Sequence, residues 1–228
     1  GARAVIYLAK TVPASFADRL RSKGAEVVVE GDDYEASVAA AKAAAAQNGW
    51  ELLSDSSWPG YTERPHRLME GYLQMAAEAF DVCPSAPSHI LLQAGVGGLA
   101  GAVAALARDR FGDRPKIIVV EPEAAPAIFE SIRAGQFVVT SGPVSTMGRL
   151  DCKEASLIAL KGLSRDADAF VTLTESEAAR AMPKLAEAGL AASESGLAGV
   201  AALLQGALAL GIGDDAQVLC FLTEGPAE

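Results

Sequence analysis

Residues 90–120 carry the pattern that most restricts how this chain can fold. The apolar run Ile90–Gln93 leads into a glycine-rich turn, a helical pattern covers Leu99–Arg110, and a second apolar run spans Lys116–Val120. Short strand-like runs and longer helical runs alternate in this way through most of the chain, which is typical of an α/β fold with a mainly parallel sheet. We therefore expect three layers, in which helices flank a parallel or mixed sheet.

The segment 55–61 divides this pattern in two. Its sequence, Asp-Ser-Ser-Trp-Pro-Gly-Tyr, has no hydrophobic periodicity, so we expect an irregular linker there. Residues 1–54 precede it and hold two predicted helices and three predicted strands, which is too little for a complete α/β domain. The predicted strands are 4–9, 26–30 and 50–54. Residues 62–228 are sufficient for a nearly complete larger domain.

The composition argues against several classes of function. A formal net charge of −10 argues against a nucleic-acid surface, which needs clustered lysine and arginine. The three cysteines are far apart and form no CxxC pair, and there are only two histidines, so we expect neither a disulfide framework nor a metal site. No apolar run approaches the roughly 20 residues of a membrane-spanning helix, so no membrane association is expected.

The turn at residues 93–100, Gln-Ala-Gly-Val-Gly-Gly-Leu-Ala, is the leading candidate for a binding site. Glycines allow backbone N–H groups to approach an anion closely, and the N-terminus of the following helix carries a positive partial charge. The alternative is a tight strand-to-helix turn that binds nothing. Three glycines within four positions at a helix start favour a phosphate site.

The pattern of this turn alone does not determine which phosphate-containing ligand it binds. Gly95, Gly97 and Ala100 fit the G-x-G-x-x-A fingerprint of dinucleotide-binding proteins. Glu121 ends the next predicted strand, where a ribose-binding acid belongs. A nicotinamide-dependent oxidoreductase is therefore one hypothesis, although the fingerprint normally opens a domain and here lies in mid-chain.

Four segments in chain order resemble a different class of phosphate-binding enzyme. The turn at 93–100 resembles a pyridoxal-phosphate (PLP) phosphate loop, and residues 118–123, Ile-Val-Val-Glu-Pro-Glu, resemble the V-x-V-E-P-E strand that follows it. Residues 194–199 resemble an E-x-G-x-x-G helix start, and residues 223–225, Thr-Glu-Gly, resemble the turn that faces the pyridine nitrogen. Together they are similar to the tryptophan-synthase-β-like class of PLP enzymes, fold type II.

Two further segments resemble the diaminopropionate ammonia-lyase family within that class. Residues 55–61, followed by Pro65 and by Met-Glu-Gly-Tyr at 69–72, resemble its D-T-x-W-x-G-Y…P…M-x-G-Y signature. Residues 5–10, Val-Ile-Tyr-Leu-Ala-Lys, resemble its V-V-Y-L-x-K strand. The resemblance spans essentially the whole chain, and the loop at 55–61 is its most specific part.

The resemblance implies a two-domain, PLP-dependent ammonia-lyase. Residues 1–54 would be the C-terminal half of the small domain, 55–61 an active-site loop, and 62–228 the large PLP-binding domain. The reaction would be α,β-elimination of 2,3-diaminopropionate to pyruvate and ammonia, with PLP as the electron sink once a base removes the α-proton. A small amino-acid substrate, a homodimer and a cytoplasmic location are the corresponding expectations.

The resemblance also implies which residues form the site. Asp55 is the candidate base or a residue that holds the substrate amine, and its alternative role is that of a turn residue. Thr223 would hydrogen-bond the pyridine nitrogen, where a neutral hydroxyl limits protonation of the ring and suits elimination over transamination. The remaining cofactor-binding residues would be Gly95, Val96, Gly97, Gly98 and Leu99.

The Schiff-base lysine of this family and its H-G-N-type loop have no counterpart in the sequence. No lysine lies in the expected S-x-K or N-x-K context, and Lys10 matches a structural lysine of the family. We therefore name no catalytic lysine. We expect the chain to be part of a longer protein, or a natural non-catalytic relative, and not to catalyse the elimination by itself.

Other functions stay open at this stage. They are another PLP-dependent amino-acid lyase such as a threonine or serine dehydratase, the nicotinamide-dependent oxidoreductase, and a non-catalytic binding module. Arg149 and Asp151 lie where the family has M-A-G-L-x-C, and this departure bears on the exact substrate.

Overall fold

The computed structural model describes residues 1–226, and the chain divides into two compact units between Ser54 and Asp55. Unit 1, residues 1–54, contains a 2-stranded parallel sheet whose register pairs Val5 with Glu26. Its elements in chain order are β1 (Val5–Leu8), α1 (Ala14–Ser22), β2 (Glu26–Val29) and α2 (Tyr34–Asn48). The assignment of this unit to the small domain of a PLP enzyme stays a prediction.

The expected strand at 50–54 is wrong, because these residues are irregular. The N–H of Trp50 donates to the carbonyl of Ala45 at 2.9 Å, so it closes the end of α2. The guanidinium of Arg3 lies 5.7 Å from the centre of the Trp50 ring. Trp50 therefore belongs to the end of α2, whereas Leu53 is 70% exposed.

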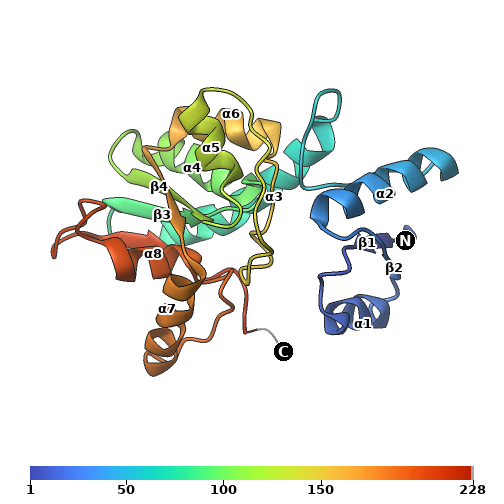
Figure 1. Ribbon diagram of the computed structural model, residues 1–228. Coiled ribbons are helices and arrows are strands. Elements are labelled where there is room, and N and C mark those ends of the chain that lie inside the picture. The colour runs from blue at the N-terminus through green and yellow to red at the C-terminus, as the bar shows by residue number, and fades with distance from the viewer. Residues whose placement is uncertain (227–228) are drawn as a thin grey trace. The chain divides into compact units, whose positions relative to one another are not determined.

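Unit 2 contains a 4-stranded parallel sheet in the order β5-β4-β3-β6 (Figure 1). Its strands are β3 (His89–Gln93), β4 (Lys116–Pro122), β5 (Ala169–Leu173) and β6 (Val218–Cys220). Its helices are α3 (Glu63–Val82), α4 (Gly98–Phe111), α5 (Ala127–Ala134), α6 (Leu157–Asp166), α7 (Glu175–Glu187) and α8 (Ala198–Gly206). All carboxyl ends of parallel strands meet at one edge, so the turns that follow β3 and β6 lie at the same edge.

The two faces of this sheet are covered by different helices. Ile90 and Leu92 are fully buried in a cluster with residues of α3, α4 and α6, whereas Leu91 and Ile118 pack with residues of α7 and α8. Figure 1 shows α4, α5 and α6 on one side of β3 and β4, and α7 and α8 on the other. Since successive strand residues point to opposite faces, the apolar runs are buried on both. The predicted three-layer α/β fold is confirmed.

Local signals also set several element boundaries. Thr174 and Glu177 form a capping box at the start of α7, in which the Thr174 hydroxyl accepts from the Glu177 N–H and the Glu177 carboxylate accepts from the Thr174 N–H. Residues 136–155 are irregular. Among residues 1–226, no helix has the combination of length and apolar composition that a membrane span requires.

Candidate functional site

The glycine turn joins the carboxyl end of β3 to the N-terminus of α4. Val96, Gly97 and Gly98 are buried, and Gly97 adopts a left-handed conformation with φ 95° that a residue with a side chain rarely adopts. Within residues 1–226, the N–H groups of residues 95–98 donate to no protein acceptor. Buried N–H groups are nearly always paired, so this cluster at a helix N-terminus is suited to an anion.

The same turn has room only for glycine at its critical positions. A Cβ atom on Gly97 would lie 2.7 Å from Cδ1 of Ile128, and one on Gly95 would lie 3.0 Å from the Arg149 carbonyl oxygen. Gly98 is less crowded, because its nearest neighbour would be Cγ of Met69 at 3.6 Å. Neighbouring segments therefore fix the backbone of the turn from both sides and keep its N–H groups in place.

Ser57 connects the 55–61 loop to this turn through the start of α6. Its hydroxyl lies 2.7 Å from that of Ser156 and accepts from the N–H of Ile158 at 2.9 Å, so it caps α6 from a distant part of the sequence. The Ser156 N–H in turn donates to the Val96 carbonyl at 2.9 Å. Both serines are buried, so the loop, the helix and the glycine turn form one hydrogen-bonded unit.

Replacing Ser57 with alanine is expected to destabilise the protein by about 1–3 kcal/mol, because the Ile158 N–H and the Ser156 hydroxyl lose a buried partner. The free energy of unfolding from urea titration measures this effect. Ser164→Ala is the matched control, since Ser164 is exposed on α6 and bonds only locally to the Lys161 carbonyl; we expect less than about 0.5 kcal/mol there. Equal effects of the two substitutions would contradict a stabilising link between Ser57 and the start of α6.

Asp55 and Tyr72 lie on the α3 side of the glycine turn. The carbonyl oxygen of Asp55 would be 3.9 Å, and Cε2 of Tyr72 3.7 Å, from a Cβ atom on Gly98. Burial raises the pKa of the Tyr72 hydroxyl, and the negative charge of Asp55 raises it further. The carboxylate of Asp55 is thus close enough to Tyr72 to influence its ionisation. The last residue of the Met-Glu-Gly-Tyr segment at 69–72 therefore lies beside the glycine turn.

Thr223 lies close to the strand that ends in the glycine turn. The Gln93 side-chain amide nitrogen is 3.0 Å from the Thr223 hydroxyl oxygen, and Gln93 is the last residue of β3. Thr223 is exposed, whereas Gln93 is only 4% exposed. A ligand bound across this edge could therefore contact the turn at one end and the Thr223 hydroxyl at the other.

The turn at 223–225 is attached to the E-x-G-x-x-G segment. The Thr223 N–H donates to the Gly196 carbonyl at 3.3 Å, and the Ser193 hydroxyl donates to the Glu224 carboxylate at 2.6 Å. Arg149 donates to the other oxygen of Glu224 at 3.1 Å. The unusual Arg149 of the sequence therefore links the 147–152 segment to this turn by an ion pair that is partly exposed.

Glu121 has a different role from the ribose-binding acid of the dinucleotide hypothesis. Its side chain is 1% exposed, and its carboxylate accepts from the N–H groups of Ile128 at 2.8 Å and Phe129 at 2.7 Å. Burial raises the pKa of Glu121 to about 8, although these two bonds act in the opposite direction. The carboxyl group of Glu121 is thus bonded to the start of α5 and does not face a ligand at the sheet edge.

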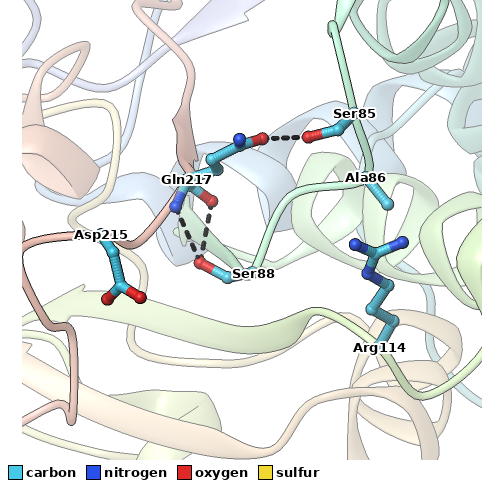
Figure 2. Close-up of a pocket in the computed structure, with 6 residues that line it drawn as sticks. All are labelled: Ser85, Ala86, Ser88, Arg114, Asp215 and Gln217. Atoms are coloured by element: carbon cyan, nitrogen blue, oxygen red, sulfur yellow. Dashed lines mark hydrogen bonds between the residues drawn. The ribbon is translucent and has the colours of Figure 1, made fainter.

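A shallow cavity of about 230 Å³ lies at the opposite edge of the sheet (Figure 2). The Ser88 hydroxyl donates to the Gln217 carbonyl and accepts from the Gln217 N–H, both at 3.0 Å. Ser88 precedes β3 and Gln217 precedes β6, so this cavity adjoins the amino ends of the strands. Its lining residues are Ser85, Ala86, Ser88, Arg114, Asp215 and Gln217. It is therefore separate from the glycine turn.

The structure brings the sequence-predicted site residues of unit 2 to one region. The Leu99 side chain packs against the core, so its proposed contribution is its N–H group. Lys153 donates to the Asp151 carboxylate at 2.6 Å and to the carbonyls of Ala124 and Pro143, which gives this ammonium group a structural role.

Sequence reasoning did not find the roles of Gln93 and Ser57, because their hydrogen-bond partners are about 100 or more residues away in the sequence.

Known proteins match both the sequence and the fold. The family described as "Pyridoxal-phosphate dependent enzyme" matches residues 1–224. The chain is 33% identical over 249 residues to the diaminopropionate ammonia-lyase of Escherichia coli (strain K12), across 100% of this chain and 62% of that relative. It is 31% identical over 140 residues to L-serine dehydratase/L-threonine deaminase of Mus musculus, across 60% of this chain and 40% of that relative.

A solved structure extends the match to three dimensions. The crystal structure of diaminopropionate ammonia-lyase from Escherichia coli, in complex with an aminoacrylate-PLP azomethine reaction intermediate, superposes with a TM-score of 0.93 at 32% identity. The match covers 99% of this chain and 62% of that one. The present chain thus spans less than two thirds of the length of these relatives.

These matches agree with the four motifs found in the sequence and with the glycine turn at the carboxyl edge of the sheet, whose N–H groups have no protein acceptor among residues 1–226. The predicted fold type II architecture, the resemblance to diaminopropionate ammonia-lyases and the PLP cofactor are confirmed. The chain belongs to the pyridoxal-phosphate dependent enzyme family.

Proposed function

We propose that this chain forms the phosphate- and ring-binding part of an ammonia-lyase that converts 2,3-diaminopropionate to pyruvate and ammonia by α,β-elimination. The observation that carries the proposal is the set of N–H groups at residues 95–98, which have no protein acceptor in the described part of the chain, although Val96, Gly97 and Gly98 are buried. A phosphate would satisfy all of them at the positive end of α4.

Each residue of the region has a distinct part in this proposal. The N–H groups of Gly95, Val96, Gly97 and Gly98, with that of Leu99, hold the phosphate. The Thr223 hydroxyl donates a hydrogen bond to the ring nitrogen. When bound, PLP supplies an electron sink for the charge that develops at the substrate α-carbon. A neutral hydroxyl at Thr223 limits protonation of the ring and thereby favours elimination over transamination.

Asp55 is the proposed acid–base residue of this chain. It lies at the start of the 55–61 loop, which the Ser57 and Ser156 hydroxyls fix beside the glycine turn. As a carboxylate it would take a proton from the substrate α-carbon or hold the substrate amine. Tyr72, whose pKa is raised by burial and further by the charge of Asp55, would remain protonated and able to donate a hydrogen bond.

The substrate and the assembly of the whole enzyme are part of the same proposal. The relatives of higher identity and coverage are diaminopropionate ammonia-lyases, and they favour this substrate over serine or threonine. We infer a small amino-acid substrate, a homodimer and a cytoplasmic location, as the resemblance to that family implies. Pyruvate release from 2,3-diaminopropionate compared with serine, in an assay of the whole enzyme, distinguishes a lyase from a dehydratase.

The binding site is testable in the 228-residue chain itself. Pyridoxamine 5′-phosphate is a suitable probe, because it requires no lysine, and pyridoxamine is the matched ligand without phosphate. We expect saturable binding of the phosphorylated compound by calorimetry and at least tenfold weaker binding of pyridoxamine, since a difference of about 1.4 kcal/mol corresponds to each factor of ten. Equal affinity for the two compounds, or no binding of either, would refute the proposed site.

A further inference from the structure

The Gln93 side chain occupies a buried position between the three segments that form the ring-binding side of the site. Its amide nitrogen lies 2.9 Å from the Phe221 carbonyl, 3.0 Å from the Gly196 carbonyl and 3.0 Å from the Thr223 hydroxyl. These partners are 103 to 130 residues away in sequence. Gln93 therefore joins β3 to both the E-x-G-x-x-G segment and the C-terminal turn.

The two carbonyl partners fix the orientation of this amide. A carbonyl oxygen can only accept, so an amide oxygen placed opposite Phe221 and Gly196 would face two further acceptors. The nitrogen must therefore point toward them, even though the amide oxygen is left buried without a protein partner among residues 1–226. That oxygen lies 3.0 Å from where a Cβ atom of Gly199 would be, so the second motif glycine makes room for it.

The orientation determines what the Thr223 hydroxyl can do. The amide nitrogen carries two hydrogens, which it shares among its three acceptors, and it does not itself accept, so the Thr223 hydroxyl has nothing to donate to on the side that faces Gln93. Its own hydrogen must point elsewhere. Thr223 is exposed, whereas the Gln93 amide is buried on the protein side of it. The hydroxyl hydrogen of Thr223 therefore points toward the solvent-exposed side, where the ligand would bind.

We propose that Gln93 is a positioning residue that orients the Thr223 hydroxyl as a hydrogen-bond donor toward the cofactor ring nitrogen, and so keeps that nitrogen unprotonated. The inference rests on the proposed function, in which Thr223 faces the ring. It adds the residue that sets the direction of the bond. The proton stays on the Thr223 oxygen, and the ring nitrogen contributes its lone pair.

The test reads the protonation of the ring directly. Pyridoxamine 5′-phosphate labelled with ¹⁵N in the ring is bound to the 228-residue chain, and the ¹⁵N chemical shift is followed with pH. We expect the bound ring nitrogen to be unprotonated and hydrogen-bonded at neutral pH in the unsubstituted chain. A protonated ring at this pH would overturn the proposal without any variant.

Gln93→Glu is the informative substitution, because a carboxyl oxygen in place of the nitrogen can accept the Thr223 hydrogen. The hydroxyl oxygen would then direct a lone pair, not its hydrogen, toward the ring nitrogen. The pH at which the bound ring nitrogen is half protonated (the pH midpoint) should therefore rise by about one unit or more, which is a tenfold change in proton affinity. Gln93→Met, which removes the donor without adding an acceptor, should shift it less. Gln205→Glu on the exposed face of α8 is the control for added charge and should leave the midpoint unchanged.

Thr223→Val separates failure of this inference from failure of the site. If this variant binds the probe with the midpoint of the unsubstituted chain, Thr223 does not face the ring and the proposed ring site is wrong. If Thr223→Val changes the midpoint but neither substitution at Gln93 does, the ring site stands and the positioning role of Gln93 is rejected.

Discussion

Replacing Gly97 with alanine is expected to remove most of the affinity for pyridoxamine 5′-phosphate and to destabilise the fold by roughly 2–5 kcal/mol. Two effects add. The residue has φ 95°, which is strained for alanine, and the new methyl group would lie 2.7 Å from Cδ1 of the fully buried Ile128. Relief of that contact must move the Ile128 side chain or the turn itself, and a shift of the turn would leave the N–H groups at 95–98 unable to converge on one anion.

Gly135→Ala is the matched control for this prediction. Gly135 also has a positive φ, 65°, but apart from its chain neighbours no atom of the described residues lies within 4 Å of the position of its Cβ atom. It should show only the backbone strain, about 1–2 kcal/mol, with unchanged affinity for the probe. Calorimetric binding and urea unfolding of both variants make the comparison. Unaltered affinity in Gly97→Ala would show that the geometry of the turn is not required for phosphate binding.

The sequence predicts the glycine turn and the sheet around it because both depend on local patterns. The apolar run of β3, the glycines and the helical pattern of α4 follow one another within about twenty residues, and each follows from backbone sterics or hydrophobic periodicity. The capping box of α7 is equally local. The resemblance to known motifs then predicted that the anion is the phosphate of PLP, which the pattern of the turn had left open.

The parts that were missed depend on contacts between distant segments. Trp50 belongs to an apolar segment whose sequence predicts a strand, but its N–H donates to a carbonyl at the end of α2. Neither α6 nor β5 was singled out, although the start of α6 is capped by Ser57 from another loop. Gln93 stood within a recognised motif, yet its role depends on Phe221, Gly196 and Thr223, which only the folded chain brings to it.

Glu121 should make the stability of the protein decrease as pH rises from about 5 to about 8. Burial raises its folded-state pKa to about 8, whereas the unfolded chain has an ordinary value near 4.5. Below the ordinary value both states are protonated and the favourable contribution is complete. Between the two values the folded state binds the extra proton, so the free energy of unfolding falls by up to about 1.4 kcal/mol per pH unit, and above 8 the contribution is lost.

Glu121→Gln tests this assignment, because it cannot ionise. Its oxygen can accept from only one of the Ile128 and Phe129 N–H groups, so at pH 5 the variant should be less stable than the unsubstituted chain by about 1–3 kcal/mol. Its stability should change less with pH, so the two urea-unfolding curves approach or cross by pH 8.5. Glu123→Gln, at an exposed position two residues along, should follow the unsubstituted chain throughout. A curve for Glu121→Gln that stays parallel to that chain would mean that Glu121 is already ionised at pH 5. In that case the two N–H bonds from α5 would outweigh the burial of the charge.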